Sequence, residues 1–162
     1  MNTTKQYCTF YVDGLFFGVD VRQVQEVIRY QELTRVPLAS RVIRGLMNLR
    51  GQIVTAIDLR LRLGLSERTG DQLPMNIIVR TDHGAASLLV DEIGDVQEVD
   101  QSNFESVPDT LCGEARTLIR GAYKLTDRLL LVLDTDKVVT LDTEMASLES
   151  PALLLAASSF SR

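Results

Sequence analysis

Short apolar runs separated by turn residues recur along this chain, and they constrain its fold more than any other feature. The first pair runs from Tyr7 to Val12 and from Leu15 to Val19, with Asp13-Gly14 between them. A short turn containing Gly between two such runs is typical of a β-hairpin. Similar signals lie at Arg50-Gly51 and at Asp82-His83-Gly84. The chain is therefore expected to consist mainly of short strands joined in hairpins.

The segment after the first hairpin combines two patterns. Apolar residues from Val21 to Ile28 recur at three- to four-residue spacing, which suits a helical turn, but the Val and Ile residues there also favour a strand. We expect one turn that passes into a strand near Gln25. Leu33 to Ser40 contains Val36-Pro37, and Pro lacks the donor that a central strand needs, so this segment is expected to be a loop.

Further strands are expected on both sides of a polar linker. Ile43 to Leu49 and Ile53 to Leu61 are apolar runs that form the second hairpin, and Ile77 to Arg80 with Ser87 to Val90 form the third. Between them, Ser66 to Pro74 is polar and contains turn-forming residues, which indicates a linker. The expected division is a first module of residues 5–66, a second of 75–140, and a tail of 141–162, within one domain of residues 1–162.

The two halves show a weak internal duplication. Apolar spacing and short motifs recur in the same order, although the offset drifts and a chance match of small motifs remains an alternative. The matched residues are Val19, Val21, Val24 and Val27 with Leu88, Val90, Ile93 and Val96; Val36-Pro37 with Val107-Pro108; Ile43 to Gly45 with Ile119 to Gly121; and Ile57-Asp58 with Leu133-Asp134.

Regularly spaced short strands favour an all-β fold made of two small antiparallel barrels, because closing a sheet removes its exposed edges. A module of this size is only marginally stable alone, so the two barrels are expected to share a hydrophobic seam. Short helical turns are expected between strands. The tail 141–162 lacks strand alternation and is a candidate for a short C-terminal helix that Pro151 would begin or interrupt.

Charge and cysteine usage narrow the classes of partner. The net charge of −5 argues against a nucleic-acid partner, since binding a phosphate backbone normally needs clustered Lys and Arg. Cys8 and Cys112 lie far apart without a paired spacing, so they are interpreted as ordinary thiols. The N-terminal residues are polar and no apolar stretch reaches the ~18 residues of a membrane span, so no membrane insertion and a cytoplasmic location are expected.

No residue pattern indicates catalysis. His83 is the only histidine and lies in an expected turn. A polar turn residue is a simpler interpretation of it than a catalytic base or a metal ligand. Neither glycine pattern of a phosphate-binding loop occurs. Asp58, Asp134 and Asp136 follow strand-like runs, where they either cap turns or form paired carboxylates, and capping is preferred. No enzyme activity, metal or cofactor is expected.

Several stretches between about Tyr7 and Val139 together carry a resemblance to a known family. The most specific part is the order of the Asn48 to Gly51 and Ile57 to Arg60 motifs. The other stretches are Phe17 to Val21, Val24 to Val27, Thr34 to Pro37, Ile43 to Gly45 and Val90 to Val96. On these residues the chain resembles the CheW family of chemotaxis coupling proteins.

The resemblance implies a fold and a function. It implies two five-stranded, SH3-like barrels with a hydrophobic core between them, and no catalytic activity. It also implies that the chain binds the regulatory domain of the histidine kinase CheA and the cytoplasmic hairpin tip of chemoreceptors. A coupling protein of a non-flagellar array, for pilus motility or surface sensing, is the related alternative. A small double-barrel enzyme and a generic SH3-like peptide-binding module are the alternatives from other classes.

Residue by residue, the resemblance implies a receptor-facing surface made of Val24, Glu26, Gly45, Arg50 and Val96. Glu26 and Arg50 have opposite charges and are expected to pair across a groove that receives a receptor helix. The alternatives are ordinary barrel core for the two valines and a solvated turn for Arg50.

A kinase contact is harder to place in the sequence. The resemblance implies one near the loop that follows Pro108, where Leu111 is the apolar candidate.

Overall fold

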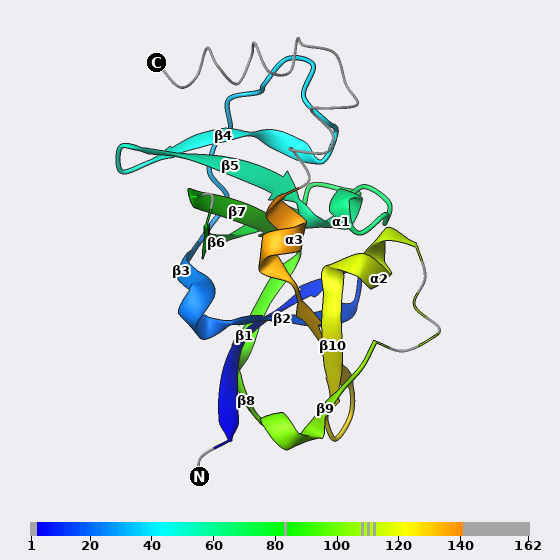
Figure 1. The fold of residues 1–162 in the computed structure, drawn as a ribbon. Coiled ribbons are helices and arrows are strands. Elements are labelled where there is room, and N and C mark those ends of the chain that lie inside the picture. The colour runs from blue at the N-terminus through cyan, green and yellow to red at the C-terminus, as the bar shows by residue number, and fades with distance from the viewer. Residues whose placement is uncertain (1–2, 83, 108, 110, 112, 141–162) are drawn as a thin grey trace.

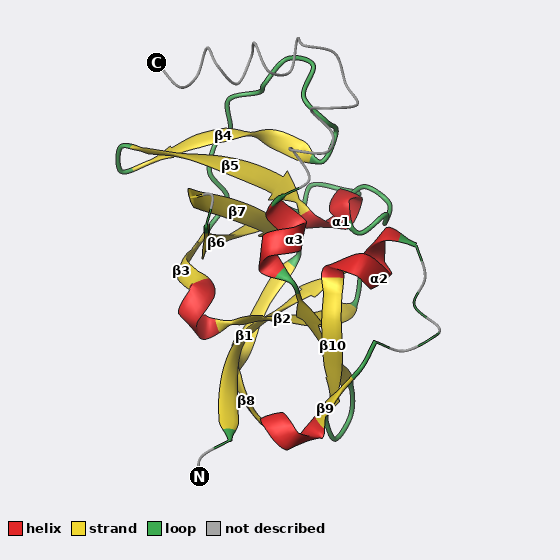
Figure 2. Cartoon of the chain, viewed as in Figure 1, coloured by secondary structure: helices red, strands yellow, loops and turns green. Residues whose placement is uncertain are grey.

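The computed structural model describes residues 3–82, 84–107, 109, 111 and 113–140, and it is an all-β fold with short helices (Figures 1 and 2). The strands are β1 Thr4–Val12, β2 Leu15–Asp20, β3 Val24–Ile28, β4 Ile43–Leu49, β5 Gln52–Asp58, β6 Met75–Thr81, β7 Gly84–Val90, β8 Glu92–Asp100, β9 Phe104–Glu105, β10 Ile119–Lys124 and β11 Leu129–Leu133. The helices are η1 Val21–Gln23, α1 Leu59–Arg62, η2 Gln101–Asn103, α2 Glu114–Leu118 and α3 Thr135–Val139.

The three expected hairpins are confirmed as β1–β2, β4–β5 and β6–β7. The helical turn before Gln25 is confirmed as η1. One boundary was wrong: the strand expected to reach Leu61 ends at Asp58, and Leu59–Arg62 is α1. The side chain of Asp58 accepts a hydrogen bond from the backbone N–H of Arg60 at 3.0 Å, which caps the helix and ends the strand.

The strands form two sheets that do not divide the chain at the linker. The first sheet has the order β8-β1-β2-β11-β10-β9 and the second has the order β3-β6-β7-β5-β4 (Figure 1). The expected modules of residues 5–66 and 75–140 therefore do not describe the sheets, because each sheet takes one hairpin from each half. In each sheet a parallel pairing, β2 with β11 or β5 with β7, joins a hairpin from the first half to a hairpin from the second half. These two pairings also depart from a purely antiparallel arrangement.

The internal duplication is visible in this topology. The strands of the second sheet follow the order β3-β6-β7-β5-β4. Their equivalents in the repeat, taken in the same order, are β8, β1, β2, β11 and β10. This is the order of the first sheet, which adds β9 at its end. The matching strands β4 and β10 also have matching bulges, between Ile43 and Gly45 and between Ile119 and Gly121. The repeated motif in the sequence thus corresponds to a repeated irregularity in the sheets.

Each sheet closes into a barrel at the same point of the repeat. In the barrel of the second sheet, the backbones of Thr34 and Leu46 exchange two hydrogen bonds of 2.8 Å, so the loop after β3 pairs with the opposite edge strand β4. In the barrel of the first sheet, β9 pairs with β10 in the same way. The segment after β3 and the segment after β8 therefore close equivalent barrels.

Both faces of the central strands are buried, which explains their continuous apolar runs. In β1, Phe10 and Val12 belong to a large core between the barrels, whereas Tyr7 belongs to the core of its own barrel. In β7, Leu88 joins the core between the barrels and Leu89 the core of the other barrel. Because alternate side chains point to opposite faces of a strand, each hairpin contributes to its own barrel and to the shared seam.

The other predictions from the sequence concern loops, caps and the tail. Residues 66–74 contain no helix or strand, as expected of a linker. Asp134 caps α3 through a hydrogen bond from the backbone of Lys137, so the capping interpretation is confirmed for Asp58 and Asp134. Within the described part of the chain, no helix has both the length and the apolar character needed to cross a membrane. His83, Pro108, Cys112 and the tail 141–162 lie outside the described residues.

Candidate functional site

A bulge in β3 sends two of the expected site residues to opposite faces of the strand. Val24 lies opposite Val79 and Glu26 lies opposite Ile78, with Gln25 as the extra residue. Without the bulge, residues two apart would share a face. Val24 is half-buried against the seam core, which supports the core-packing alternative for this residue. Glu26 instead points to the other side, where the β4–β5 hairpin lies.

Arg50 is held in a tight two-residue turn between β4 and β5. Arg50 and Gly51 both have positive φ, of 51° and 88°, which is the geometry of a type I′ hairpin turn. The side-chain oxygen of Asn48 accepts a hydrogen bond from the backbone of Gly51 at 2.8 Å and secures the turn. A positive φ is uncommon for a residue with a side chain, so the turn places the Arg50 guanidinium at some conformational cost.

The expected pair between Glu26 and Arg50 is confirmed. The Arg50 Nη2 donates to the Glu26 Oε2, and the two side chains span from edge strand β3 to the turn that follows edge strand β4. This hydrogen bond and the Arg50 charge hold the pKa of the Glu26 carboxyl below its usual range. Arg50 remains 68% exposed while Glu26 is 23% exposed, so the guanidinium presents most of its surface to solvent.

Gly45 has a role inside the barrel. A Cβ at this position would lie 2.6 Å from the carbonyl oxygen of Thr34, the residue that closes the barrel against β4. Its backbone φ of 151° is also one that residues with side chains rarely adopt. The close approach that Gly45 allows in this structure is therefore to the chain's own backbone.

Val96 and Leu111 lie away from the Glu26–Arg50 pair. Val96 is in β8 of the other barrel, opposite Cys8, and is 58% exposed, so the core-packing alternative is wrong for it. Leu111 is half-buried and packs against the seam core together with Val107 and Ala115. Of the six site residues, the structure thus brings Glu26 and Arg50 into contact, with Val24 on β3 and Gly45 on β4, the two edge strands of the same sheet.

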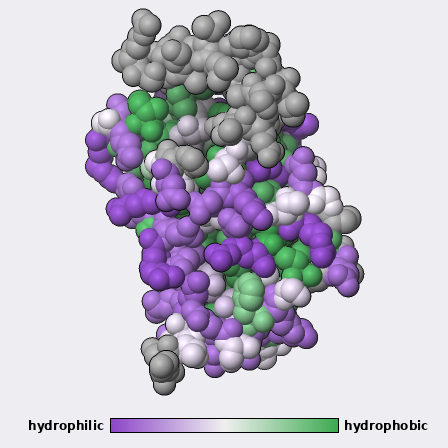
Figure 3. Space-filling model, in the orientation of Figure 1, coloured by the Kyte–Doolittle hydropathy of each residue, from purple (hydrophilic) through white to green (hydrophobic). Residues whose placement is uncertain are grey.

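Sequence reasoning missed two exposed apolar side chains near this pair. Val27 follows Glu26 in β3 and is 36% exposed, and Ile53 follows the turn of Arg50 in β5 and is 54% exposed. Val27 is also the repeat equivalent of Val96, because the two lie opposite Ile77 and Cys8 at matching positions. The internal duplication, which matches Val27 with Val96, is the sequence signal from which Val27 could have been identified. On the face shown in Figure 3, apolar patches are separated by hydrophilic residues.

The arrangement suits docking by contact. It offers an exposed ion pair on a barrel, and exposed Val27 and Ile53 follow its two residues closely in the sequence. Arginine is enriched at protein-binding surfaces. Among the described residues, no group of three or more His, Cys, Asp or Glu side chains could hold a metal ion. Asp58 and Asp134, the strand-end carboxylates considered above, are occupied in helix caps.

Comparison with known proteins identifies the relatives of this chain. It is 30% identical over 152 residues to the chemotaxis protein CheW of Bacillus subtilis, covering 94% of this chain and 97% of that protein. It is 29% identical to the chemotaxis protein CheW of Treponema pallidum, covering 82% and 81%. The crystal structure of the scaffolding protein TtCheW from Thermoanaerobacter tengcongensis superimposes with a TM-score of 0.73 at 28% identity, covering 80% of this chain and 88% of that one.

The domain family gives the same result over most of the sequence. Residues 6–142 match the CheW-like domain, a range that contains β1 from its third residue, all the other strands, the linker and all six expected site residues. The chain therefore belongs to the CheW-like domain family.

Proposed function

We propose that this chain is a non-enzymatic adaptor that couples chemoreceptors to the histidine kinase CheA at cytoplasmic receptor–kinase arrays. Family membership and the likeness to a protein described as a scaffold support this function. The observation that carries it is the exposed Glu26–Arg50 pair, which links edge strand β3 to the turn after edge strand β4 of the same barrel.

The receptor would bind around this pair. One barrel contributes Val24, Glu26, Gly45 and Arg50 to this surface. Exposed Val96 would extend the contact across the seam onto the surface of the other barrel. A receptor helix laid against this surface would bury aliphatic side chains while the ion pair fixes its orientation. The regulatory domain of CheA would bind elsewhere, with Leu111 and the loop around it as the candidate contact.

Two fused barrels suit an adaptor because the shared core fixes the relative position of their surfaces. Side chains from both sheets fill one hydrophobic cluster, so a partner on one barrel is held at a set distance from a partner on the other. A related function, coupling in a pilus-motility or surface-sensing array, uses the same surfaces with a different kinase and receptor.

Co-sedimentation tests the proposal. Receptor-containing membranes are mixed with purified CheA in the presence and absence of this chain, and the pellet is assayed for both proteins. We expect CheA to sediment with the receptors only when the chain is present, and the chain to bind each partner alone. A chain that binds neither partner, or only one, would contradict the adaptor function. Identification of the kinase pulled down from cells separates the chemotaxis array from its alternative.

A further inference from the structure

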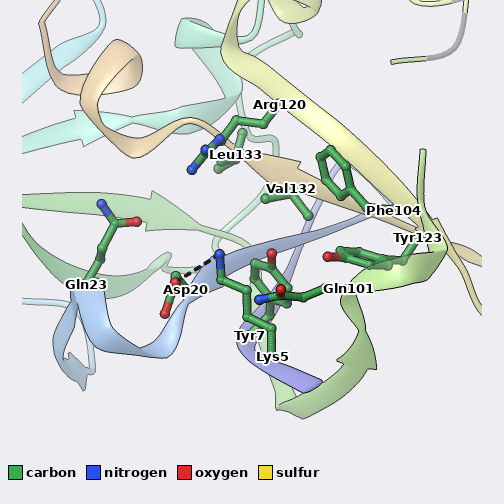
Figure 4. Close-up of a pocket in the computed structure, with 10 residues that line it drawn as sticks. All are labelled: Lys5, Tyr7, Asp20, Gln23, Gln101, Phe104, Arg120, Tyr123, Val132 and Leu133. Atoms are coloured by element: carbon green, nitrogen blue, oxygen red, sulfur yellow. Dashed lines mark ion pairs between the residues drawn. The ribbon is translucent and has the colours of Figure 1, made fainter. Parts of the chain in front are cut away.

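A second surface lies on the other barrel, away from the Glu26–Arg50 pair. It is a pocket of about 430 Å³ formed by β1, the end of β2 with η1, the η2–β9 segment, and strands β10 and β11 (Figure 4). This volume is within the range of ligand-binding pockets in proteins. The residues that line it are Lys5, Tyr7, Asp20, Gln23, Gln101, Phe104, Arg120, Tyr123, Val132 and Leu133.

Aromatic rings form the apolar part of this pocket. Tyr7 and Tyr123 are buried with ring centroids 5.7 Å apart, and Phe104 meets Tyr123 edge-to-face at 5.2 Å. Burial and a hydrogen bond with Tyr123 raise the pKa of Tyr7, so its hydroxyl stays uncharged. Phe104 is 43% exposed and forms an accessible aromatic wall. The pocket thus offers an apolar surface on which an apolar side chain of a bound partner could pack.

The charged residues at the pocket leave a local excess of positive charge. The Asp20 carboxylate lies 3.4 Å from the Lys5 Nζ and 2.7 Å from an Arg22 nitrogen, so it is already paired twice. The hydrogen bond from Arg22 outweighs partial burial and lowers the pKa of Asp20 to about 2. Arg120 is exposed, and no described carboxylate lies within ion-pair distance of its guanidinium. Figure 4 shows the Arg120 side chain above the aromatic rings.

The internal repeat shows why this arginine is different. Arg44 and Arg120 are the extra residues of the matching bulges in β4 and β10. In its own barrel, Arg44 Nε lies 3.5 Å from the buried carboxylate of Asp58. Asp58 and the equivalent acid, Asp134, both cap a helix, but no ion pair joins Asp134 to Arg120 in the described part of the chain. One arginine of the repeat is therefore neutralised inside the chain, and the other is available to an external anion.

We propose that this pocket receives an acidic side chain of a partner protein, bound by Arg120, together with a neighbouring apolar side chain that packs on Phe104 and Tyr123. The net charge of the chain is −5, so a small free anion gains nothing from the overall field, whereas a protein segment adds apolar burial to the ion pair. Arginine also binds a carboxylate in a bidentate geometry that fixes the orientation of the bound segment.

The inference rests on the proposed function, because the partners to be tested are CheA and the receptor. Binding of each is measured by calorimetry with the wild-type chain, Arg120→Glu, Arg120→Lys and Arg41→Glu. Arg41 is exposed, belongs to the other barrel's loop and provides a control charge reversal of the same size outside the pocket. Thermal unfolding of each variant checks that its fold is intact.

We expect Arg120→Glu to weaken binding of at least one partner by about tenfold or more, and Arg120→Lys to weaken it less, since it keeps the charge and loses the bidentate geometry. The loss should shrink at high ionic strength. If Arg120→Glu and Arg41→Glu bind equally while the wild type binds normally, the inference about this pocket is overturned but the proposed function stands. Absence of binding by the wild type would overturn the proposed function as well.

A small-molecule occupant has its own signature. Free succinate is titrated into the labelled chain while the Arg120 Nε resonance is followed by NMR. A saturable shift of this resonance at millimolar succinate, combined with unchanged partner binding by Arg120→Glu, would assign the pocket to a small anion and overturn the proposal. No such shift, together with the loss of partner binding, supports the protein segment.

Discussion

Arg60 binds both carboxylate oxygens of Asp91, with hydrogen bonds of 3.0 Å from Nε and 2.7 Å from Nη2. Arg68 from the linker adds bonds of 3.2 and 2.8 Å to the same carboxylate, and the backbone of Asp13 donates at 2.7 Å. Asp91 thereby ties the linker and α1 to the turn of the β1–β2 hairpin. The polar linker is thus fixed to both barrels near the seam.

Asp91→Asn should destabilise the fold by about 2 to 3 kcal/mol, because it removes the charged partner of largely buried Arg68 and leaves largely buried Arg60 with only its longer pair to Asp13. Urea denaturation of the wild type and the variant measures this difference in unfolding free energy. Asp127→Asn is the matched control, since Asp127 lies 3.6 Å from Arg128 but is exposed, and it should cost less than about 0.5 kcal/mol. Equal losses in both variants would show that the Asp91 cluster adds nothing beyond a surface pair.

The stabilisation from Asp91 should depend on pH. Burial alone would raise the pKa of its carboxyl, but hydrogen bonds from Arg60, Asp13 and Arg68 outweigh it and lower the pKa from 3.8 to about 2. A depressed pKa in the folded state stabilises the fold above the unfolded value, and this contribution is lost as pH falls through the folded value. The difference between wild type and Asp91→Asn should be constant above about pH 5 and shrink between about pH 4 and pH 2. Urea midpoints across this range measure it, and a constant difference would contradict the assignment.

Gly45→Ala should destabilise the chain by about 2 to 4 kcal/mol, because the new Cβ would lie 2.6 Å from the Thr34 carbonyl oxygen in an unfavourable backbone conformation. Gly64→Ala separates the two causes. Gly64 has a φ of 78° but no atom within 4 Å of the added Cβ, so only backbone strain of about 1 kcal/mol is expected. Urea unfolding compares the variants, and equal effects would argue against the close contact.

Arg50→Glu should weaken receptor binding by about tenfold, because it places two carboxylates together and removes the exposed guanidinium. The double variant with Glu26→Arg restores opposite charges and should recover most of the binding. Receptor co-sedimentation measures both. Arg41→Glu reverses another exposed paired arginine, 3.7 Å from Glu67, and should leave receptor binding unchanged. Unchanged binding in Arg50→Glu would remove this pair from the receptor-binding surface.

The resemblance in sequence led to the Glu26–Arg50 pair, but not to its surroundings. The two charges were visible as opposite in sign, and the structure places them in contact. The packing of Val24 and Leu111 against the seam core was not predictable, because it depends on which strand covers each face. Arg120 was noticed only as part of a repeated motif, and its difference from Arg44 depends on the ion pair with Asp58 that only Arg44 makes among the described residues.

Local sequence determined the strands, the hairpins and the helix caps, because turn residues and alternating apolar side chains act over a few neighbouring positions. It also determined the repeat and the family. Only the tertiary structure decided that β1–β2 joins β8, β10 and β11 while β6–β7 joins β3, β4 and β5. Pairing between distant strands depends on how buried faces fit together in the seam, and this fit is a property of the folded chain as a whole.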